Sequence, residues 1–241
     1  MTQIINQTKK IASCSEGEIE TCYQLLCRGF LDINRDDFIR DFQEKDAVIL
    51  LRKDRSEGEI VGFSTLMVLT LTLLGEEIKG VFSGDTFVLP EYRGSTGLGV
   101  GLGQYFVETY EQFPRHKVYY ILMSKGWRTY KILPFFFKEF APHYEISTST
   151  SEKALIDAFG KTKYPHYYQP ETGLIQFGQS AARLRPESVD AVPMKMDEHI
   201  RFFLQRNPGY LQGDELVCVA RVVPENATNI FQRLVPFYIV L

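Results

Sequence analysis

A short segment of the sequence, residues 85–102, combines a carboxylate, an arginine and several glycines in a pattern that could bind phosphate groups. It reads DTFVLPEYRGSTGLGVGL, in which an apolar run ends at Pro90 and a basic corner follows. Four glycines lead from this corner into a helical pattern: Gly94, Gly97, Gly99 and Gly101. Such residues leave backbone N–H groups uncovered where the helix dipole is positive. The segment therefore predicts a pyrophosphate site at the start of a helix.

The bulk composition is that of an ordinary globular protein. The chain has 241 residues, of which 44% are hydrophobic and 24% charged, with a net charge of -3. These values are typical of a domain with a real core, and they leave room for one appended module. Because no basic face dominates, we expect no nucleic-acid partner.

Cysteine spacing and apolar runs exclude two further classes. The four cysteines form no CxxC pair, so we expect reduced thiols and no metal site. The longest apolar run, residues 60–74, contains Gly62, Ser64 and several threonines, and is too short and too β-branched for a membrane span. The first residues have no apolar core typical of a signal peptide. We therefore expect a cytoplasmic protein.

Hydrophobic spacing predicts the elements that position the glycine-rich segment. A strand over 11–14 precedes a helix that begins at a capping box formed by Ser15 and Glu18. The elements expected next are a helix over 36–42, strands over 47–52, 60–72 and 78–89, a helix over 101–113, a strand over 118–123, a helix over 127–140 and a strand over 144–148. Short turns between three consecutive strands indicate an antiparallel meander. The fold class is thus α/β, with a mixed sheet of the α+β kind.

The element order and the glycine-rich corner together resemble the GCN5-related N-acetyltransferase superfamily. The motif is carried by residues 88–94, VLPEYRG, and by Gly97-Leu98-Gly99. The resemblance implies that this corner binds the pyrophosphate of coenzyme A, and that the strand before it splays from its neighbour to admit the pantetheine arm. The implied contacts are Val88, Leu89, Arg93, Gly94, Ser95, Thr96, Gly97, Leu98, Gly99 and Arg128.

One departure from the family pattern affects this corner. The family spacing is Arg-x-x-Gly-x-Gly, whereas three residues separate Arg93 from Gly97 here. Either the loop bulges slightly, or Gly94 takes the first position and Arg93 is pushed outward. The hydroxyls of Ser95 and Thr96 could add donors to a phosphate.

The resemblance also implies acyl transfer to an amine, which needs a base. Asp85 lies in an otherwise apolar strand and is the candidate, because a buried carboxylate has a raised pKa. The alternative is an aspartate that satisfies backbone donors at a bulge made by Gly84. Relatives often carry a tyrosine acid where this chain has phenylalanines; Tyr130 could substitute, or could simply pack on its helix. The thiolate could also leave unaided.

The function implied is that of an acyl-CoA-dependent N-acyltransferase acting on an amine of a small molecule or peptide. The donor is acetyl-CoA or a longer acyl-CoA, depending on whether the apolar residues 132–137 face the acyl end of the cleft or the core. Residues 1–150 form the expected acyl-CoA-binding domain. Residues 151–241 form an extension that packs on it and could shape the acceptor pocket. In this extension we expect helices over 152–159, 193–205 and 227–234 and a strand over 215–222. The chain is expected to be a monomer or a homodimer. The alternative function is a catalytically degenerate module that binds thioesters or a peptide without turnover.

Overall fold

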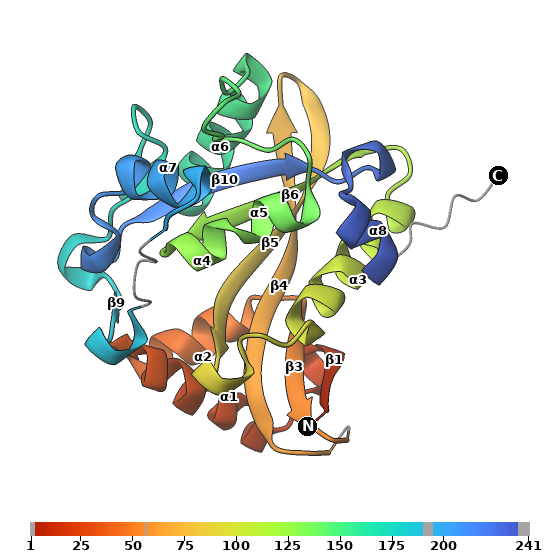
Figure 1. The fold of residues 1–241 in the computed structure, drawn as a ribbon, viewed down its shortest axis with the longest axis vertical. Helices are drawn as coiled ribbons and strands as arrows, with labels where there is room; N and C mark the ends of the chain where they lie inside the picture. The colour runs from red at the N-terminus through yellow and green to blue at the C-terminus, as the bar shows by residue number, and fades with distance from the viewer. Residues whose placement is uncertain (1–2, 56, 190–194, 236–241) are drawn as a thin grey trace.

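The computed structural model describes residues 3–55, 57–189 and 195–235. In this part of the chain one eight-stranded sheet has the order β1-β3-β4-β5-β6-β10-β8-β7 (Figure 1). Its strands are β1 Ile4–Lys10, β3 Ala47–Lys53, β4 Ile60–Leu73, β5 Glu76–Val88, β6 Lys117–Ser124, β7 Tyr168–Gln169, β8 Leu174–Ile175 and β10 Glu215–Arg221. A separate small sheet pairs β2 Phe30–Leu31 with β9 Arg183–Leu184. The expected α/β class with a mixed sheet is confirmed.

Eight helices are found in the same described ranges, with a few single 3-10 turns between them. They are α1 Glu16–Gly29, α2 Arg35–Gln43, α3 Gly97–Gln112, α4 Trp127–Tyr130, α5 Ile132–Phe136, α6 Thr150–Lys163, α7 Glu198–Arg206 and α8 Asn229–Leu234. The capping box predicted at the start of α1 is present. The Ser15 side chain accepts from the Glu18 N–H, and the Glu18 carboxylate accepts from the Ser15 N–H.

The sheet changes character at β5. Strands β1, β3, β4 and β5 pair antiparallel, which confirms the predicted meander. Strand β5 then pairs parallel with β6, but only from Ile78 to Ser83. Beyond Ser83, β5 curves away from β6 toward α1 and α2 (Figure 1). The sheet therefore opens next to the segment that the sequence singled out.

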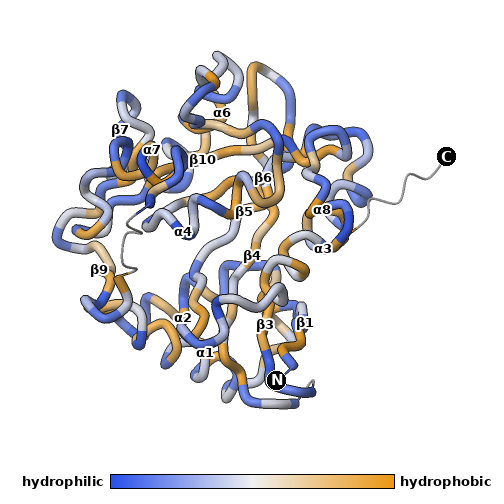
Figure 2. Tube along the Cα trace, viewed as in Figure 1, coloured by the Kyte–Doolittle hydropathy of each residue, from blue (hydrophilic) through white to orange (hydrophobic). Residues whose placement is uncertain are grey.

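Helices cover both faces of this sheet. The Phe82 ring packs on Phe159 of α6, with centroids 5.2 Å apart. The next residue, Ser83, bonds the hydroxyl of Tyr120, whose ring lies 4.6 Å from Phe106 of α3. Neighbouring residues of a strand point to opposite faces, so α6 and α3 lie on opposite sides. Hydrophobic residues accordingly concentrate along the central strands and on α3, whereas the surrounding loops are largely hydrophilic (Figure 2).

The predictions of strands over 11–14 and 144–148 are wrong. Residues 11–13 form a 3-10 turn, and the first strand is β1, just before it. Because β1 is an edge strand with a half-exposed face, it lacks the apolar pattern that marks the inner strands. Residues 144–148 form no strand. The place beside β6 is taken by β10, which pairs with it from Leu216 to Arg221.

The helix expected over 127–140 is divided. Its first part is α4, its second is α5, and Phe137 is already extended. Pro134 falls in the first turn of α5, where the missing N–H removes no intrahelical bond. A proline inside a helical pattern either kinks the helix or starts its second half, and the structure has the second outcome.

The region after residue 150 contributes to the same sheet. Its predicted helices over 152–159 and 227–234 correspond to α6 and α8, and its predicted strand over 215–222 corresponds to β10. The helix expected over 193–205 corresponds to α7, which begins at Glu198, while residues 193 and 194 lie outside the described residues. A domain boundary near residue 150 stays a prediction.

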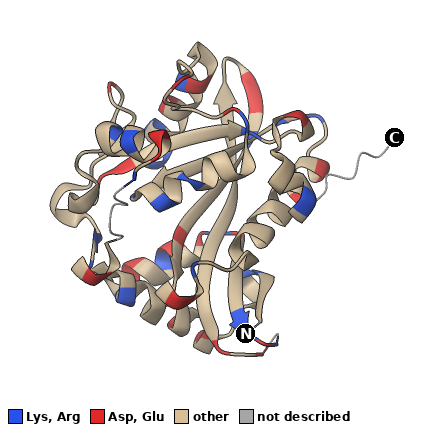
Figure 3. Ribbon diagram, viewed as in Figure 1, with Lys and Arg blue, Asp and Glu red and all other residues tan. Residues whose placement is uncertain are grey.

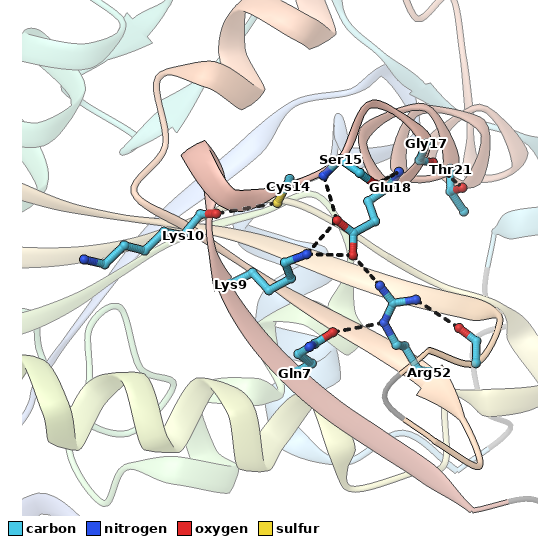
Figure 4. Close-up of polar contacts among 10 residues, drawn as sticks. Gln7, Lys9, Lys10, Cys14, Ser15, Gly17, Glu18, Thr21 and Arg52 are labelled. Carbon is cyan, nitrogen blue, oxygen red and sulfur yellow. Dashed lines mark hydrogen bonds and ion pairs between the residues drawn. The ribbon is translucent and has the colours of Figure 1, made fainter.

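A charged network ties the first strand and helix to the sheet (Figure 4). The carboxylate of Glu18 on α1 accepts from Lys9 of β1 at 2.8 Å and from Arg52 of β3 at 2.5 Å. Arg52 also donates to Gln7 and to the backbone carbonyl of Gly58. Burial alone would raise the pKa of Glu18, but the bonds from Lys9 and from the Ser15 N–H lower it overall.

Replacing Glu18 by glutamine should lower the free energy of unfolding by about 1–3 kcal/mol at pH 7. Glutamine keeps the capping acceptor but leaves the largely buried Arg52 without an opposite charge. Because the native pKa of Glu18 is depressed, its contribution is lost as pH falls below the ordinary glutamate pKa of about 4.3. Urea unfolding at pH 7 and at pH 3 measures this. An equal difference at both pH values would contradict a role for the charge.

Candidate active site

A β-bulge in β5 sets the position of Asp85. Ser64 and Leu66 of β4 are opposite Thr86 and Ser83, so Gly84 and Asp85 together oppose a single residue of β4. A Cβ on Gly84 would lie 2.7 Å from the Thr65 hydroxyl oxygen and 2.9 Å from Lys45 Cε. Only glycine fits there. The Thr86 hydroxyl reinforces the bulge with bonds to the Ser64 hydroxyl at 2.7 Å and to the Gly84 carbonyl at 3.1 Å.

Asp85 faces a cavity of about 340 Å³ at the opening between β5 and β6. The cavity extends from α3 and α4, which contribute Leu102 and Thr129, to the turn between α1 and α2, which contributes Asp32 and Asn34. Its remaining lining comes from Leu26, Phe30, Ile33, Asp37, Phe38, Asp41, Ser64, Phe82, Ser83, Gly84, Thr86, Leu122, Met123, Lys125, Ile132, Tyr164, Phe177, Ser180, Ala182 and Glu215. The opening thus connects the two faces of the sheet.

The electrostatic environment of Asp85 suits a base. Burial, followed by the nearby Asp41 carboxylate, raises the pKa of Asp85 to about 6, although Lys45 and Lys125 oppose this rise. In the described part of the chain no residue donates a hydrogen bond to the Asp85 carboxylate. It is therefore ionised at neutral pH, yet basic enough to accept a proton from a bound molecule.

One of the two backbone N–H groups at the end of β5 points into the opening. The Leu89 N–H donates to the Val61 carbonyl of β4 at 3.0 Å. Because N–H groups alternate between the two sides of a strand, the Val88 N–H points the other way, toward β6. The Val88 carbonyl accepts from Arg93 Nε at 3.1 Å. Of the two amides predicted to contact coenzyme A here, that of Val88 is directed into the opening and that of Leu89 is used within the sheet.

The Arg93 contact also decides how the corner accommodates its extra residue. Residues 90–92 form a 3-10 turn, and Arg93 folds back onto the end of β5, with its guanidinium 5.8 Å from the Phe87 ring. The arginine is not pushed outward. The insertion instead lengthens the loop between Arg93 and the start of α3.

The start of α3 has uncovered backbone N–H groups. The first N–H to bond within the helix is that of Val100, which donates to the Thr96 carbonyl at 2.9 Å. No side chain caps this end and its first turn has no acidic residue, whereas α1, α2, α6, α7 and α8 are capped by side chains. The Ser95 hydroxyl oxygen is buried without a hydrogen-bond partner. These groups together favour an anion.

The four glycines of this corner differ in how much space a side chain would have at each position. A Cβ on Gly101 would come within 2.9 Å of Ile49, and one on Gly97 within 3.2 Å of Leu51, so both positions let α3 approach the sheet closely. A Cβ on Gly94 would meet nothing within 4 Å, and one on Gly99 would make only ordinary contacts with phenylalanine rings. Packing therefore explains Gly97 and Gly101 but not Gly94 and Gly99. Leu98 lies between Gly97 and Gly99 in the first turn of α3.

Two predicted site residues lie apart from the cavity. Tyr130 is fully buried, and its hydroxyl donates to the Pro142 carbonyl at 2.8 Å. Burial raises the pKa of Tyr130, which makes it a poor source of protons. Arg128 is exposed, with its guanidinium 4.6 Å from the Trp127 ring centroid. Neither side chain lines the cavity with Asp85.

Several lining residues were not predicted from the sequence. Lys125, just after β6, pairs with Glu215 of β10 at 3.1 Å and donates to the Ala182 carbonyl at 2.9 Å. Tyr164 and Phe177 pack together with ring centroids 5.4 Å apart. All of these residues except Lys125 come from the last hundred residues of the chain. Tyr164 begins the aromatic segment 164–168, whose composition is compatible either with the mouth of a substrate pocket or with a packed surface loop.

The described residues give no indication of a metal centre or a membrane span. They contain no group of three or more His, Cys, Asp or Glu side chains arranged to hold a metal ion. None of the helices in these ranges has the length and apolar character needed to cross a bilayer.

Comparisons of sequence find no relative: no family model and no curated protein match the chain. Similar solved structures include a probable N-acyltransferase from Enterococcus faecalis V583, with a TM-score of 0.43, 12% identity and coverage of 57% of this chain and 33% of that chain. A GCN5-related N-acetyltransferase from Kribbella flavida has a TM-score of 0.40 and 15% identity, and the match covers 54% of this chain and 32% of that chain. Arabidopsis thaliana NAA60 in complex with a bisubstrate analogue has a TM-score of 0.39 and 17% identity, and the match covers 56% of this chain and 86% of that chain.

The matched part of the chain thus spans about a third of the first two structures. These overlays are partial, and the fold assignment rests on features of the chain itself. An antiparallel meander leads into a parallel pair, the pair opens beside a bulged strand, and a glycine-rich helix start follows that strand. In these respects the chain resembles the fold that its sequence motif implies, that of the GCN5-related N-acetyltransferases.

Proposed function

We propose that the chain is an N-acyltransferase that moves a short acyl group from coenzyme A to an amine. The observation that carries this proposal is the opening between β5 and β6. It brings Asp85, an uncommitted Val88 N–H and a cavity that reaches both faces of the sheet to one place. The coarser assignment, a thioester-dependent acyltransferase, accords with the fold.

The start of α3 fits the pyrophosphate of coenzyme A. The N–H groups of residues 96–99, the orphaned Ser95 hydroxyl and the open space beside Gly94 form a concave set of donors without a competing carboxylate. A doubly charged phosphate group is the ligand that such a helix start favours. When bound, coenzyme A supplies the activated acyl group as a thioester.

Asp85 then has the role of a general base. An amine that enters as an ammonium ion transfers a proton to the Asp85 carboxylate, directly or through one water, and its freed electron pair forms the C–N bond. The Val88 N–H donates toward the carbonyl oxygen, on which negative charge develops. The C–S bond breaks as the carbonyl re-forms, and the positively charged nitrogen loses its remaining extra proton to the departing thiolate or to water. A thiolate with a conjugate-acid pKa near ~8.5 is an adequate leaving group without Tyr130.

The apolar residues 132–137 favour a short acyl group. Phe136 and Phe137 are buried and pack in the core against Phe106 of α3 and Phe231 of α8. They therefore face the core. Only Ile132 of this cluster lines the cavity. This cluster therefore contributes little apolar surface to the cavity for a long acyl chain.

Acetyl-CoA should stabilise the purified chain, and palmitoyl-CoA should not serve as an acyl donor. At a hundredfold excess over Kd, a bound ligand adds about 2.7 kcal/mol, or about 5–10 °C in Tm for a chain of this size. Thermal shift with coenzyme A, acetyl-CoA and palmitoyl-CoA measures binding. Thiol release across a panel of amines measures transfer.

The two readouts separate the candidate functions. Stabilisation together with amine-dependent thiol release from acetyl-CoA supports the transferase. Stabilisation without thiol release for any amine would identify a binding module. No stabilisation by any of the three compounds would overturn the acyl-CoA assignment itself.

A further inference from the structure

The acceptor side of the cavity is rich in carboxylates. Its acidic lining residues are Asp32, Asp37, Asp41, Asp85 and Glu215. In the described ranges Lys125 is the only cation of the lining, and it already pairs with Glu215 and the Ala182 carbonyl. The wall therefore offers a bound molecule several negative groups and no uncommitted positive one.

Ion pairs offset part of this charge: four of the five carboxylates have a cationic partner, and for Asp85 no ion pair is found among the described residues. The partners are Arg183 for Asp32, Arg40 for Asp37 and Lys45 for Asp41. None of these three cations lines the cavity. The side chain of Asp37 is 63% exposed and that of Asp32 is 60% exposed, so both remain open to a ligand. Figure 3 shows acidic residues on α2 and on the turn before it.

Aromatic rings complete this half of the cavity. Phe30 comes from β2, directly after α1, and Phe38 comes from α2; Tyr164 and Phe177 come from the later part of the chain. Ring faces and carboxylates together suit organic cations, because the rings attract positive charge while contacting methylene groups. An acceptor with a carboxylate would meet repulsion from the wall instead.

A bridge across the cavity limits the size of the acceptor. Strand β9 pairs with β2, the short strand that directly follows α1. Arg185 Nε donates to the Cys27 carbonyl at 2.7 Å, and the Ser188 hydroxyl donates to the Arg28 carbonyl at 3.2 Å. This segment reaches from the upper part of the molecule down to α1 (Figure 1). It links the later part of the chain to the end of α1, beside the lining residues Ser180 and Ala182.

From the charge and the bridge we infer that the acceptor is a small amine carrying a second positive charge, such as a diamine. One ammonium group lies at Asp85 and gives up its proton. The other lies among the carboxylates of the turn between α1 and α2, with Asp32 and Asp37 as the specificity-determining residues. The inference rests on the proposed function and names the substrate class of the same site.

Three amines of equal length test this. The probes are 1,4-diaminobutane, 1-aminobutane and 4-aminobutanoate, which differ only in the charge at the far end. With acetyl-CoA and the full chain, kcat/KM for the diamine should exceed that for the monoamine at least about tenfold, as expected for one charged contact. The carboxylate compound should be the poorest substrate. The advantage of the diamine should shrink as salt screens the wall.

Matched variants locate the second charge. Asp37→Asn and Asp32→Asn should each raise KM for the diamine about three- to tenfold more than they raise KM for the monoamine. Asparagine is suitable at position 32 because this residue has a φ of 62°, which asparagine tolerates. Asp36→Asn is the control, since Asp36 is exposed in the same turn of α2 but does not line the cavity. Tm of each variant checks folding.

The outcomes separate the inference from the function beneath it. Equal turnover of the monoamine and diamine, or a preference for 4-aminobutanoate, overturns the inference and leaves the transferase intact. Calorimetric binding of the diamine that Asp37→Asn weakens, without turnover, supports the cationic site and contradicts the transferase. If the diamine neither binds nor reacts while another amine is acetylated, the inference fails.

Discussion

Replacing Asp85 by asparagine should lower kcat for acyl transfer by about 10²–10⁴-fold while leaving the affinity for coenzyme A unchanged. Asparagine keeps the shape of the side chain but cannot take a proton from an ammonium ion. The start of α3 is untouched by the change, so donor binding should persist. Steady-state kinetics, with coenzyme A affinity from calorimetry, measures both quantities.

The pH dependence gives a second signature of the same group. Burial, together with the Asp41 carboxylate, raises the pKa of Asp85 to about 6, so the base is increasingly protonated below that pH. The kcat/KM of the wild type should therefore fall about tenfold per pH unit below about pH 6. The residual activity of Asp85→Asn should lack this limb. A wild-type profile that stays flat down to pH 5 would contradict the assignment of the base.

The same substitution should stabilise the fold at alkaline pH. Because the native pKa of Asp85 lies above the ordinary aspartate value of 3.8, its ionisation disfavours the folded state as pH rises through about 6. The free energy of unfolding of Asp85→Asn should exceed that of the wild type by up to about 3 kcal/mol at pH 8, and the two values should be equal near pH 4. A variant less stable than the wild type at pH 8 would instead favour an aspartate that holds the bulge at Gly84.

Replacing Thr96 by aspartate should have effects of opposite sign on stability and on coenzyme A affinity. Thr96 is exposed at the uncapped start of α3 and makes no side-chain cap bond. A negative charge there interacts favourably with the helix dipole, which should add about 0.3–1 kcal/mol to the free energy of unfolding. The same charge repels a pyrophosphate, and coenzyme A affinity should fall about 30- to 100-fold.

Thr96→Asn is the matched control, because it has nearly the same shape without the charge. It should bind coenzyme A within a few fold of the wild type. Calorimetric titration and urea unfolding of the three proteins measure the effects. If the aspartate variant binds coenzyme A as tightly as the asparagine variant, the pyrophosphate does not lie at this helix start.

Local signals in the sequence predict most of the frame around the site. The capping box at Ser15 marks the start of α1, and continuous apolar runs mark β3, β4 and β6. The glycine-rich segment marks the start of α3, although the helix begins at Gly97 rather than at Gly101. Each of these features depends on neighbours within a few residues, which is why the sequence alone reveals them.

Long-range pairing accounts for what the sequence does not reveal. Nothing near residue 120 indicates that β10, almost a hundred residues later, completes the sheet beside β6. A short apolar stretch at 144–148 was the local candidate for that place, and the pairing with β10 overrides it. The same pairing brings Glu215 to Lys125. Most carboxylates of the acceptor side likewise look like ordinary surface residues in the sequence, because only the folded chain brings them to one cavity.

The site residues follow the same division. Asp85 could be predicted because an isolated carboxylate in an apolar strand is conspicuous and a preceding glycine indicates a bulge. Tyr130 was misleading because helical spacing does not tell whether a ring faces a cleft or the core. Its hydroxyl is held by the Pro142 carbonyl, a contact set by the chain's path after α5.

The most direct test of the central claim is a crystal structure of the full chain with coenzyme A. The pyrophosphate oxygens should lie within about 2.7–3.2 Å of N–H groups between residues 96 and 99. The sulfur should lie in the opening between β5 and β6, near the Val88 N–H and on the way to Asp85. Coenzyme A bound elsewhere, or a β5–β6 pair that stays closed beyond Ser83, would contradict the account.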